Sequence, residues 1–461
     1  MYMNPNLDRS SLYFLIFLIC AVALLAMAVQ IAQAQESRFI SLKDAIDIAL
    51  VNNIELKRSS YQVASSKISL GQSKAAFFPN LSASASASQG YSRDYDPMTD
   101  VTQNRESHSL NLGLSTRLTI FDGFGNIASL QNARRQLLAN EESLLRVKDS
   151  VIFETFSRYL QVLMDEELLA SERENLTAQR QQLERIEEFY KVGNRSLADL
   201  LQQQAGISQA ELRVLQAEEY LNISKLQLLK MIGLSPSMDY EVEVMPIEDL
   251  VSELASGDVD VQLGMALENR TDIRSQAFSI EAVEKQIKAA RSGYWPTLSL
   301  SAEVGSGYNS SFEYADFSDQ ILDINPDARV GLSLSIPIFD RSVTKSAIER
   351  ARVQLDNERL SLEDLTQTVT FEVQQSLFDY QTSQKQLEAA ETQREFARQA
   401  LEVTEERYDV GSAILAELTL ARAQYVAANN DWIQSSYSLL LSRVALDYYA
   451  GRLDACPALP L

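Results

Sequence analysis

Side chains able to perform enzymatic chemistry are scarce in this sequence. His108 is the only histidine, and we find no Cys and His cluster at metal-ligand spacing, no Ser-His-Asp combination away from His108, and no glycine-rich phosphate loop. Carboxylates are abundant, but they lie along the faces of predicted helices, where they are typical of a solvated surface. We therefore predict a protein that is not an enzyme and that holds no cofactor and no metal.

The most distinctive polar residues lie in two closely similar segments, Tyr190–Leu200 and Tyr408–Leu418. Each contains a Tyr, a Val-Gly pair, an acid and a Leu at the same spacing. A phenol can donate a hydrogen bond, and carboxylates such as Asp199 and Glu417 attract cations or stabilise the start of a helix. Glycine supplies the backbone freedom needed where two helices reverse direction. Each segment is therefore predicted to be the tip of a long helical hairpin.

The two tips belong to a tandem duplication. Phe78-Pro79-Asn80-Leu81 reappears as Trp295-Pro296-Thr297-Leu298, Ile120-Phe121-Asp122 reappears as Ile338-Phe339-Asp340, and each copy is displaced by 217 or 218 residues. Pro79 and Pro296 mark the start of a strand in each repeat. We predict a first repeat over residues 35–234, a connector over 235–257, a second repeat over 258–453 and a short tail over 454–461.

The repeats are predicted to contain the same elements in the same order. The first opens with a helix from Leu42 to about Ala76, capped by Ser41 and Asp44 and ended before Pro79. Two strands follow, and polar stretches over 92–109 and 309–326 connect the strands of each pair. A long coiled-coil helix over about 123–190 and a return helix over about 197–231 complete the repeat, and the second return helix covers about 415–449.

Alternation in the predicted strands indicates membrane insertion. Leu81–Ala87 alternates Leu and Ala with Ser, and Leu110–Ile120 alternates apolar residues with small or polar ones. One apolar face and one small, polar face are typical of transmembrane β-strands, whereas a sheet packed on its own helices would expose long charged side chains. Four strands leave open edges, which lipid does not tolerate, so several chains must combine.

The composition and the first residues indicate an exported protein. The net charge of −22 over 461 residues argues against nucleic acid as a partner, because phosphate binding needs clustered Lys and Arg. Residues 1–34 have the order of a signal peptide, with cleavage before Gln35, and an uncleaved membrane anchor is the alternative. Ile19 argues against lipidation at Cys20, so Cys456 would be the only cysteine of the mature chain.

With these features the sequence resembles the TolC family of bacterial outer-membrane efflux proteins. The resemblance covers about Ser41 to Leu453 and is carried by the Phe/Trp-Pro-x-Leu strand starts, the Ile-Phe-Asp strand ends and the paired Val-Gly tips. It implies an α+β membrane protein, a homotrimer whose twelve-stranded barrel lies in outer-membrane lipid of a Gram-negative cell and continues into an α-helical tunnel across the periplasm. It also implies a periplasmic adaptor, or membrane fusion protein, joined to an inner-membrane RND, ABC or MFS transporter.

The resemblance further implies roles for single residues. The periplasmic gate would comprise Asp199, Tyr408, Glu417 and Leu420, and the adaptor would contact Val192, Gly193, Leu197, Val410, Gly411 and Leu415. Two positions depart from the family pattern, because an arginine of some members is Ala413 here and a second acid is Leu420. The tip lock is therefore expected to be weaker or built differently, with an apolar constriction at Leu420 as the alternative.

The function implied is a passive outer-membrane exit duct of a tripartite efflux pump or a type I secretion system. The alternative is a periplasmic coiled-coil adaptor, a structural protein with one hairpin flanked by small β domains. Heat-modifiable migration and extraction only by detergent would separate the duct from the adaptor. The cargo is expected to be chosen by the inner-membrane pump.

Overall fold

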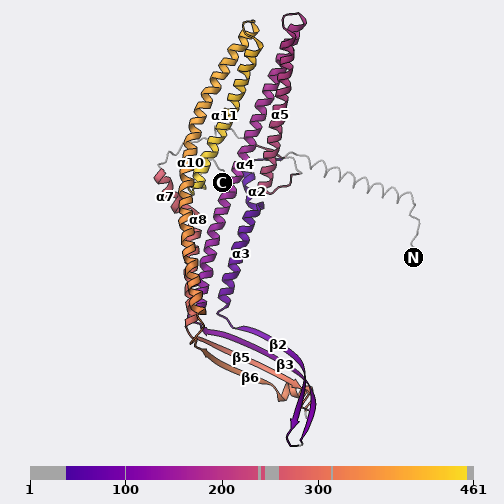
Figure 1. Cartoon of the computed structure of the whole chain (residues 1–461), viewed down its shortest axis with the longest axis vertical. Coiled ribbons are helices and arrows are strands. Elements are labelled where there is room, and N and C mark those ends of the chain that lie inside the picture. Colours follow the sequence, from indigo (N-terminus) through magenta and orange to yellow (C-terminus); the bar gives the residue numbers. More distant parts are fainter. Residues whose placement is uncertain (1–37, 99, 237–239, 244–258, 313–314, 454–461) are drawn as a thin grey trace, which may run out of the picture. The chain divides into compact units, whose positions relative to one another are not determined.

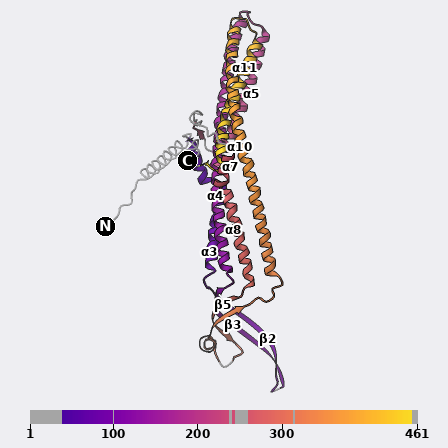
Figure 2. The same ribbon diagram turned by 90° about the vertical axis from the view of Figure 1, so that its left-hand side faces the viewer.

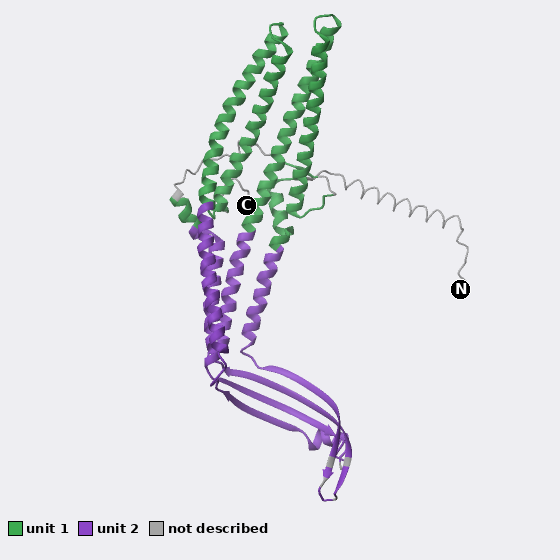
Figure 3. Ribbon diagram, viewed as in Figure 1, with its two compact units in different colours: residues 1–56, 148–266, 372–461 green, residues 57–147, 267–371 purple. Residues whose placement is uncertain are grey.

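The computed structural model of the chain describes residues 38–98, 100–236, 240–243, 259–312 and 315–453. These residues form two compact units, one drawn from 1–56, 148–266 and 372–461 (unit 1) and one from 57–147 and 267–371 (unit 2) (Figure 3). Each unit combines segments of both sequence repeats. The predicted signal peptide, Cys20 and the tail with Cys456 lie outside the described residues.

Unit 2 contains an antiparallel four-stranded sheet with the strand order β2-β3-β5-β6 (Figure 1). Its strands are β2 (Asn80–Asp96), β3 (Val101–Phe121), β5 (Thr297–Asn309) and β6 (Asp327–Ser335). Pro79 and Pro296 stand directly before β2 and β5, as predicted. Strands β2 and β6 are the edges, so each is paired on one side only.

The polar stretch over 92–109 was predicted as a connector, and this prediction was wrong. Strands β2 and β3 continue through it, with Tyr91 paired to Glu106 and Asp96 paired to Val101. Tyr, Val and Thr in this stretch favour extended backbone, but polar residues on both faces hide the alternation. The second connector, over 309–326, is confirmed and contains α9 (Phe317–Asp319) and η3 (Gln320–Ile324).

The register of the sheet separates its two faces, as the alternation predicted. Leu114 is paired with Ala83 and Val304, and Leu332 is paired with Leu300, so apolar residues share one face. Serines and glycines share the other face, where hydroxyl groups of paired strands hydrogen-bond to each other, as in Ser82 Oγ to Ser115 Oγ at 2.9 Å. The sheet is therefore apolar on one side and small and polar on the other.

The first helix of each repeat is interrupted, which corrects the prediction of one continuous helix over 42–76. Helices α2 (Leu42–Asn52) and α3 (Ile54–Ala75) meet at Asn53, whose Oδ1 accepts hydrogen bonds from the N–H groups of Glu55 and Leu56. The second repeat breaks at Arg270, between α7 (Val259–Asn269) and α8 (Thr271–Arg291). Asn53 and Arg270 lie 217 residues apart, so the break belongs to the repeat.

Two long hairpins dominate the helical part, with bounds close to those predicted. They are α4 (Gly125–Lys191) with α5 (Leu197–Ile232), and α10 (Val343–Asp409) with α11 (Leu415–Tyr449). Within unit 1 the hairpins lie side by side (Figures 1 and 2). Phe153 stacks on Tyr448 with ring centroids 4.6 Å apart, and Ser171 Oγ donates to Asn430 Oδ1 at 2.9 Å. Contacts between α4 and α11 therefore join the two repeats.

A short parallel strand pair completes unit 1. Strands β1 (Arg38–Ile40) and β4 (Tyr240–Val242) are joined by the buried Tyr159 hydroxyl, which donates to the carbonyl oxygens of Ile40 and Glu243. Part of the predicted connector over 235–257 is therefore a strand. Among the described residues, no helix has the length and apolar character needed to span a membrane.

Candidate functional site

Both hairpin tips turn in the same way. Gly193 and Gly411 adopt left-handed backbone conformations, with φ of +80° and +77°. The N–H of Asn194 donates to Phe189 O at 2.8 Å, and the N–H of Ser412 donates to Arg407 O at 2.7 Å. These bonds span the turn and satisfy carbonyl groups at the end of each helix. Glycine is therefore needed at both tips for its backbone conformation, in agreement with the sequence pattern.

The return helices begin differently. Ser196 and Asp199 form a capping box at the start of α5, in which Asp199 N–H donates to Ser196 Oγ at 3.1 Å and Ser196 N–H donates to Asp199 Oδ2 at 3.3 Å. Helix α11 has no side-chain cap, and Glu417 instead forms an ion pair with Arg407 at 3.3 Å. Two acids at equivalent sequence positions thus have different partners.

Tyr408 lies at the centre of an apolar cluster between the tips. Its side chain is only 3% exposed and packs with Ile186 from α4 and with Ala413, Leu415 and Leu418 from the second hairpin. The cluster therefore joins the first hairpin to the second. Because the Ala413 methyl group is buried there, a guanidinium group at this position would have to displace its neighbours.

Arg195 supplies a cation to this cluster from the first tip. Its guanidinium lies 4.2 Å from the centroid of the Tyr408 ring, and Nη2 donates to the Tyr408 carbonyl oxygen at 3.3 Å. An ion pair between Arg185 and Asp409, at 3.7 Å, also joins the hairpins. Sequence reasoning missed Arg195. The sequence contained a signal for it, because Arg195 lies two residues after Gly193 and therefore occupies the first-repeat position that corresponds to Ala413 after Gly411.

The Tyr408 hydroxyl is buried and makes no well-formed hydrogen bond among the described residues, although the Gln182 side chain lies beside it. The Nε2 of the neighbouring Gln182 is in the same situation. Burial raises the pKa of the Tyr408 phenol above its usual value. The Arg195 charge lowers this pKa, the Asp199 charge raises it, and the Gln182 side chain lowers it. Asp199 therefore acts on the phenol through its charge, although the hydrogen bonds of its carboxylate are made within the capping box.

The predicted contact residues at the tips differ in exposure. Val192, Leu197 and Val410 are exposed, Val410 to 80%, and the glycines have open space where a side chain would stand. Leu415 is only 3% exposed and belongs to the Tyr408 cluster, so it does not offer the surface contact expected of it. Leu420, one turn into α11, is exposed.

A polar cavity of about 280 Å³ lies between the hairpins of unit 1. Its lining includes the buried amides of Asn175, Gln182 and Gln203 and the guanidinium groups of Arg213 and Arg422. Asn175 Nδ2 has no partner among the described residues. The contact between the hairpins is therefore apolar around Tyr408 and polar along this cavity.

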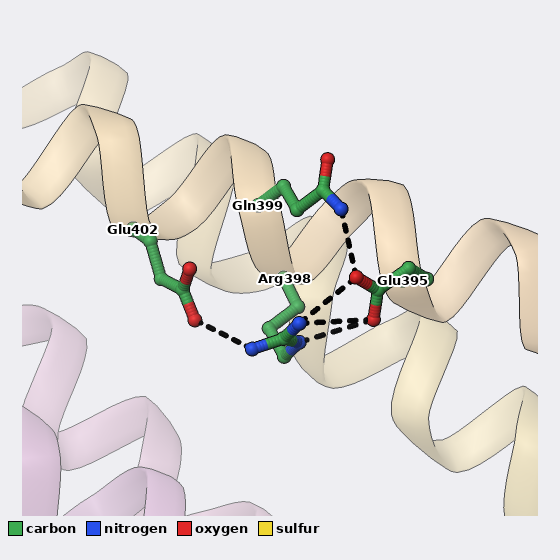
Figure 4. A network of polar contacts seen from close by, with 4 residues as sticks. All are labelled: Glu395, Arg398, Gln399 and Glu402. Atoms are coloured by element: carbon green, nitrogen blue, oxygen red, sulfur yellow. Dashed lines mark hydrogen bonds and ion pairs between the residues drawn. The ribbon is translucent and has the colours of Figure 1, made fainter.

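Many carboxylates away from the tips follow the predicted surface pattern, but Asp165, Glu172 and Asp447 are buried. On α10, Arg398 forms ion pairs with Glu395 at 2.8 Å and with Glu402 at 2.9 Å, and Gln399 donates to Glu395 at 2.7 Å (Figure 4). Hydrogen bonds from Arg398 and Gln399 lower the pKa of Glu395. All four residues belong to one helix and point to solvent, so they stabilise α10 locally and do not form a binding site.

Comparison with known proteins gives a consistent result. A sequence model of the family described as Outer membrane efflux protein matches residues 45–234 and 263–452. The solvent efflux pump outer membrane protein SrpC of Pseudomonas putida is 28% identical over 395 residues, which are 82% of this chain and 78% of SrpC. The alkaline protease secretion protein AprF of Pseudomonas aeruginosa is 20% identical over 420 residues, 90% of this chain and 85% of AprF.

A solved structure agrees in fold. The Campylobacter jejuni CmeC outer membrane channel superimposes with a TM-score of 0.76 at 20% identity, covering 89% of this chain and 86% of that chain. Duplicated hairpins and a two-faced sheet, together with these likenesses, define a channel component of the outer membrane, neither an enzyme nor a periplasmic adaptor. The chain belongs to the outer membrane efflux protein family. The predicted class of function is thereby confirmed, and the adaptor alternative is rejected.

Proposed function

We propose that the chain forms a homotrimeric, passive exit duct that crosses the outer membrane and reaches into the periplasm. The observation that carries this proposal is the pair of unpaired sheet edges, β2 and β6. The sheet also has an apolar face on which Leu114 and Leu332 are exposed. Unpaired backbone groups are costly in lipid, so such a sheet enters a membrane only when its edges pair with other chains.

Three chains would contribute twelve strands, because each sheet has four. Transmembrane sheets that close on themselves need at least about eight strands. One chain therefore falls short, and three is the number that the family resemblance implies. Rotational symmetry would then surround a single axis with three copies of each tip.

The proposed partners are a periplasmic adaptor at the tips and, behind it, an inner-membrane transporter of the RND, ABC or MFS type. The relatives support this arrangement, since SrpC is named for a solvent efflux pump and AprF for alkaline protease secretion. The exposed Val192, Leu197 and Val410 offer an apolar contact surface, and the buried Leu415 supports it from beneath. Because the relatives serve unlike cargo, we assign the choice of cargo to the transporter.

The tips are proposed as the periplasmic gate, with Asp199, Tyr408, Glu417 and Leu420 as its residues. In the closed duct, the Tyr408 hydroxyl would donate to the Asp199 carboxylate and hold the hairpins together. The hydroxyl makes no well-formed hydrogen bond among the described residues, although the Gln182 side chain lies beside it, and an ionised carboxylate has acceptor sites beyond those used in the capping box. Three Glu417 side chains would attract cations to the mouth, and Leu420 would narrow it one turn further on.

Single-channel recording in planar bilayers tests the gate. Combining Tyr408→Phe with Asp199→Ala should raise the conductance, because the link between the hairpins is lost. Ser196→Ala is the matched control, since it removes the capping bond, worth about 1 kcal/mol, and leaves both gate groups in place. If Ser196→Ala raises the conductance equally, Asp199 acts only as a cap and the gate lies elsewhere. A folded monomer recovered from bilayers would overturn the trimer.

A further inference from the structure

In unit 2, three helix ends meet beside the sheet, and two glycines allow their backbones to approach closely. A side chain at Gly123 would place its Cβ 2.4 Å from Trp295 Cβ, and one at Gly293 would place it 2.7 Å from Thr344 Oγ1. Gly123 precedes α4, Gly293 follows α8, and Thr344 lies in the first turn of α10. The end of α8 therefore packs against the starts of both long helices.

Basic residues collect at this junction, although the chain as a whole carries a net charge of −22. Lys288 and Arg291 lie in the last turn of α8, and Arg341 and Lys345 flank the start of α10. All four are exposed, and none forms an ion pair within the described part of the chain. The nearby Asp122 and Asp340 accept hydrogen bonds from the N–H groups of Asn126 and Thr344 as helix caps.

The same junction exposes large apolar side chains. Trp295 is 56% exposed and Phe339 is 82% exposed, and Phe78 and Phe124 are also exposed. Phe339 follows Ile336 and Ile338, which extend the apolar row of β6 beyond the strand. Aromatic rings beside basic side chains are typical of the boundary between lipid and water. The apolar row therefore leads directly from the sheet to the basic junction.

A cavity of about 350 Å³ brings these two kinds of side chain together. Its lining includes the apolar Phe124, Ile127 and Trp295 and the cations Lys288 and Arg291. We propose that this cavity binds the phosphodiester headgroup of an anionic phospholipid in the periplasm-facing leaflet of the outer membrane. The proposal rests on the proposed insertion of the sheet into that membrane.

Helix dipoles alone do not account for the cluster. Lys288 and Arg291 would be favourable at the end of α8 without any ligand. Arg341 and Lys345 stand at the start of α10, where the dipole disfavours cations, and they have no acidic partner among the described residues. An anion in the cavity would contact Lys288 and Arg291, whereas Arg341 and Lys345 lie outside its lining and add to the positive charge of the junction. The exposed aromatic rings are continuous with the apolar row of β6. They therefore favour a lipid, rather than an anionic glycan, as the source of the anion.

Trp295 provides a direct test, because the chain has only two tryptophans. Trp432→Phe leaves Trp295 as the single fluorophore. In phosphatidylcholine bilayers, brominated phosphatidylglycerol should quench Trp295 at lower mole fractions than brominated phosphatidylcholine. Lys288→Gln with Arg291→Gln should reduce this preference by about fivefold for each cation removed. Lys288→Arg should retain the preference for phosphatidylglycerol, because it keeps the charge. The double variant Lys230→Gln with Lys385→Gln should retain the preference too, because it removes two exposed cations elsewhere.

Equal quenching by the two lipids in the parent, or an undiminished preference in the Lys288/Arg291 variant, would overturn the headgroup site. Soluble glycerol phosphodiesters and peptidoglycan fragments are tested as competitors. If either protects Trp295 from quenching by the brominated lipid, the cations bind that soluble anion instead and the lipid site is rejected. Heat-modifiable migration of the same preparation shows separately whether the protein has inserted as an oligomer, so the test of the duct and the test of the headgroup site stay distinct. A parent that does not insert as an oligomer contradicts the proposed duct, whereas an inserted oligomer without lipid preference contradicts only this site.

Discussion

The guanidinium of Arg195 lies 4.2 Å from the centroid of the Tyr408 ring, across 213 positions of sequence. This contact joins the first hairpin tip to the second. The position in the second tip that corresponds to Arg195 is Ala413, whose side chain is buried beside Tyr408. The cation between the tips therefore comes from the first repeat in this chain.

Arg195→Ala should loosen the closed tips. A cation–π contact of this kind contributes about 1 kcal/mol, so the closed state should become less populated and the mean single-channel conductance should rise. The mean conductance of Arg195→Lys should lie between those of the parent and Arg195→Ala, because lysine keeps the charge but lacks the planar guanidinium group. Arg180→Ala is the control, since Arg180 pairs with Glu211 inside the first hairpin at 2.8 Å. Parental conductance in Arg195→Ala would show that the contact does not close the tips.

Removing Arg407 and removing Glu417 should change ion selectivity in opposite directions. The pair is 3.3 Å apart and about half exposed, so Arg407 offsets part of the Glu417 charge. Arg407→Gln should increase cation preference, and Glu417→Gln should decrease it and relieve block by divalent cations. Reversal potentials in a salt gradient measure both effects, which should shrink at high ionic strength. Unchanged reversal potentials in both variants would place the selective ring elsewhere.

Leu332→Arg should impair assembly of the duct far more than Ser333→Arg. The two residues are neighbours on β6 but face opposite sides of the sheet, because Leu332 is paired with Leu300 and Ser333 with Ser299. An arginine on the lipid-facing side costs about 2–4 kcal/mol per chain near the middle of the membrane, whereas the polar side tolerates charge. The yield of heat-modifiable oligomer measures the difference. Equal yields would mean that the apolar face does not contact lipid.

Asp272 should make the stability of the helices depend on pH. Burial raises its pKa, but hydrogen bonds and charge from Arg270, with the charge of Arg146, bring it below the usual value. The folded state therefore favours the carboxylate, and its contribution is fully present above about pH 4 and is lost as the pH falls further. Asp272→Asn should cost about 3 kcal/mol at pH 7, because the buried Arg270 loses an ion pair of 2.6 Å.

Thermal unfolding in detergent at pH 7 and pH 3 measures this dependence. The difference in stability between the parent and Asp272→Asn should narrow at pH 3, because that pH lies below the usual aspartate pKa and the unfolded chain then binds a proton that the folded carboxylate resists. Asp379→Asn, which changes an exposed aspartate of α10, should leave the unfolding temperatures at pH 7 and pH 3 close to those of the parent. If the difference in stability between the parent and Asp272→Asn is the same at both pH values, the lowered pKa of Asp272 is contradicted.

The sequence alone determined the elements of this protein and their order. Repetition at 217 or 218 residues identified two equivalent halves, and the spacing of apolar residues identified long helices and two-faced strands. Strand starts at Pro79 and Pro296 and tips at Gly193 and Gly411 followed from backbone preferences of single residues. Apart from the repetition itself, these features are local, since each depends on residues a few positions apart.

The tertiary structure decided which residues of the two repeats meet. Arg195 contacts Tyr408, Leu415 is buried beneath the tip, and α8 brings Lys288 to the same cavity as Phe124. No periodicity encodes these contacts, because they depend on how whole helices and hairpins pack against each other in space. The break at Asn53 was missed for a related reason, since it depends on hydrogen bonds from two backbone N–H groups to the Asn53 side chain. The break at Arg270 has no side-chain cap that a sequence pattern could reveal.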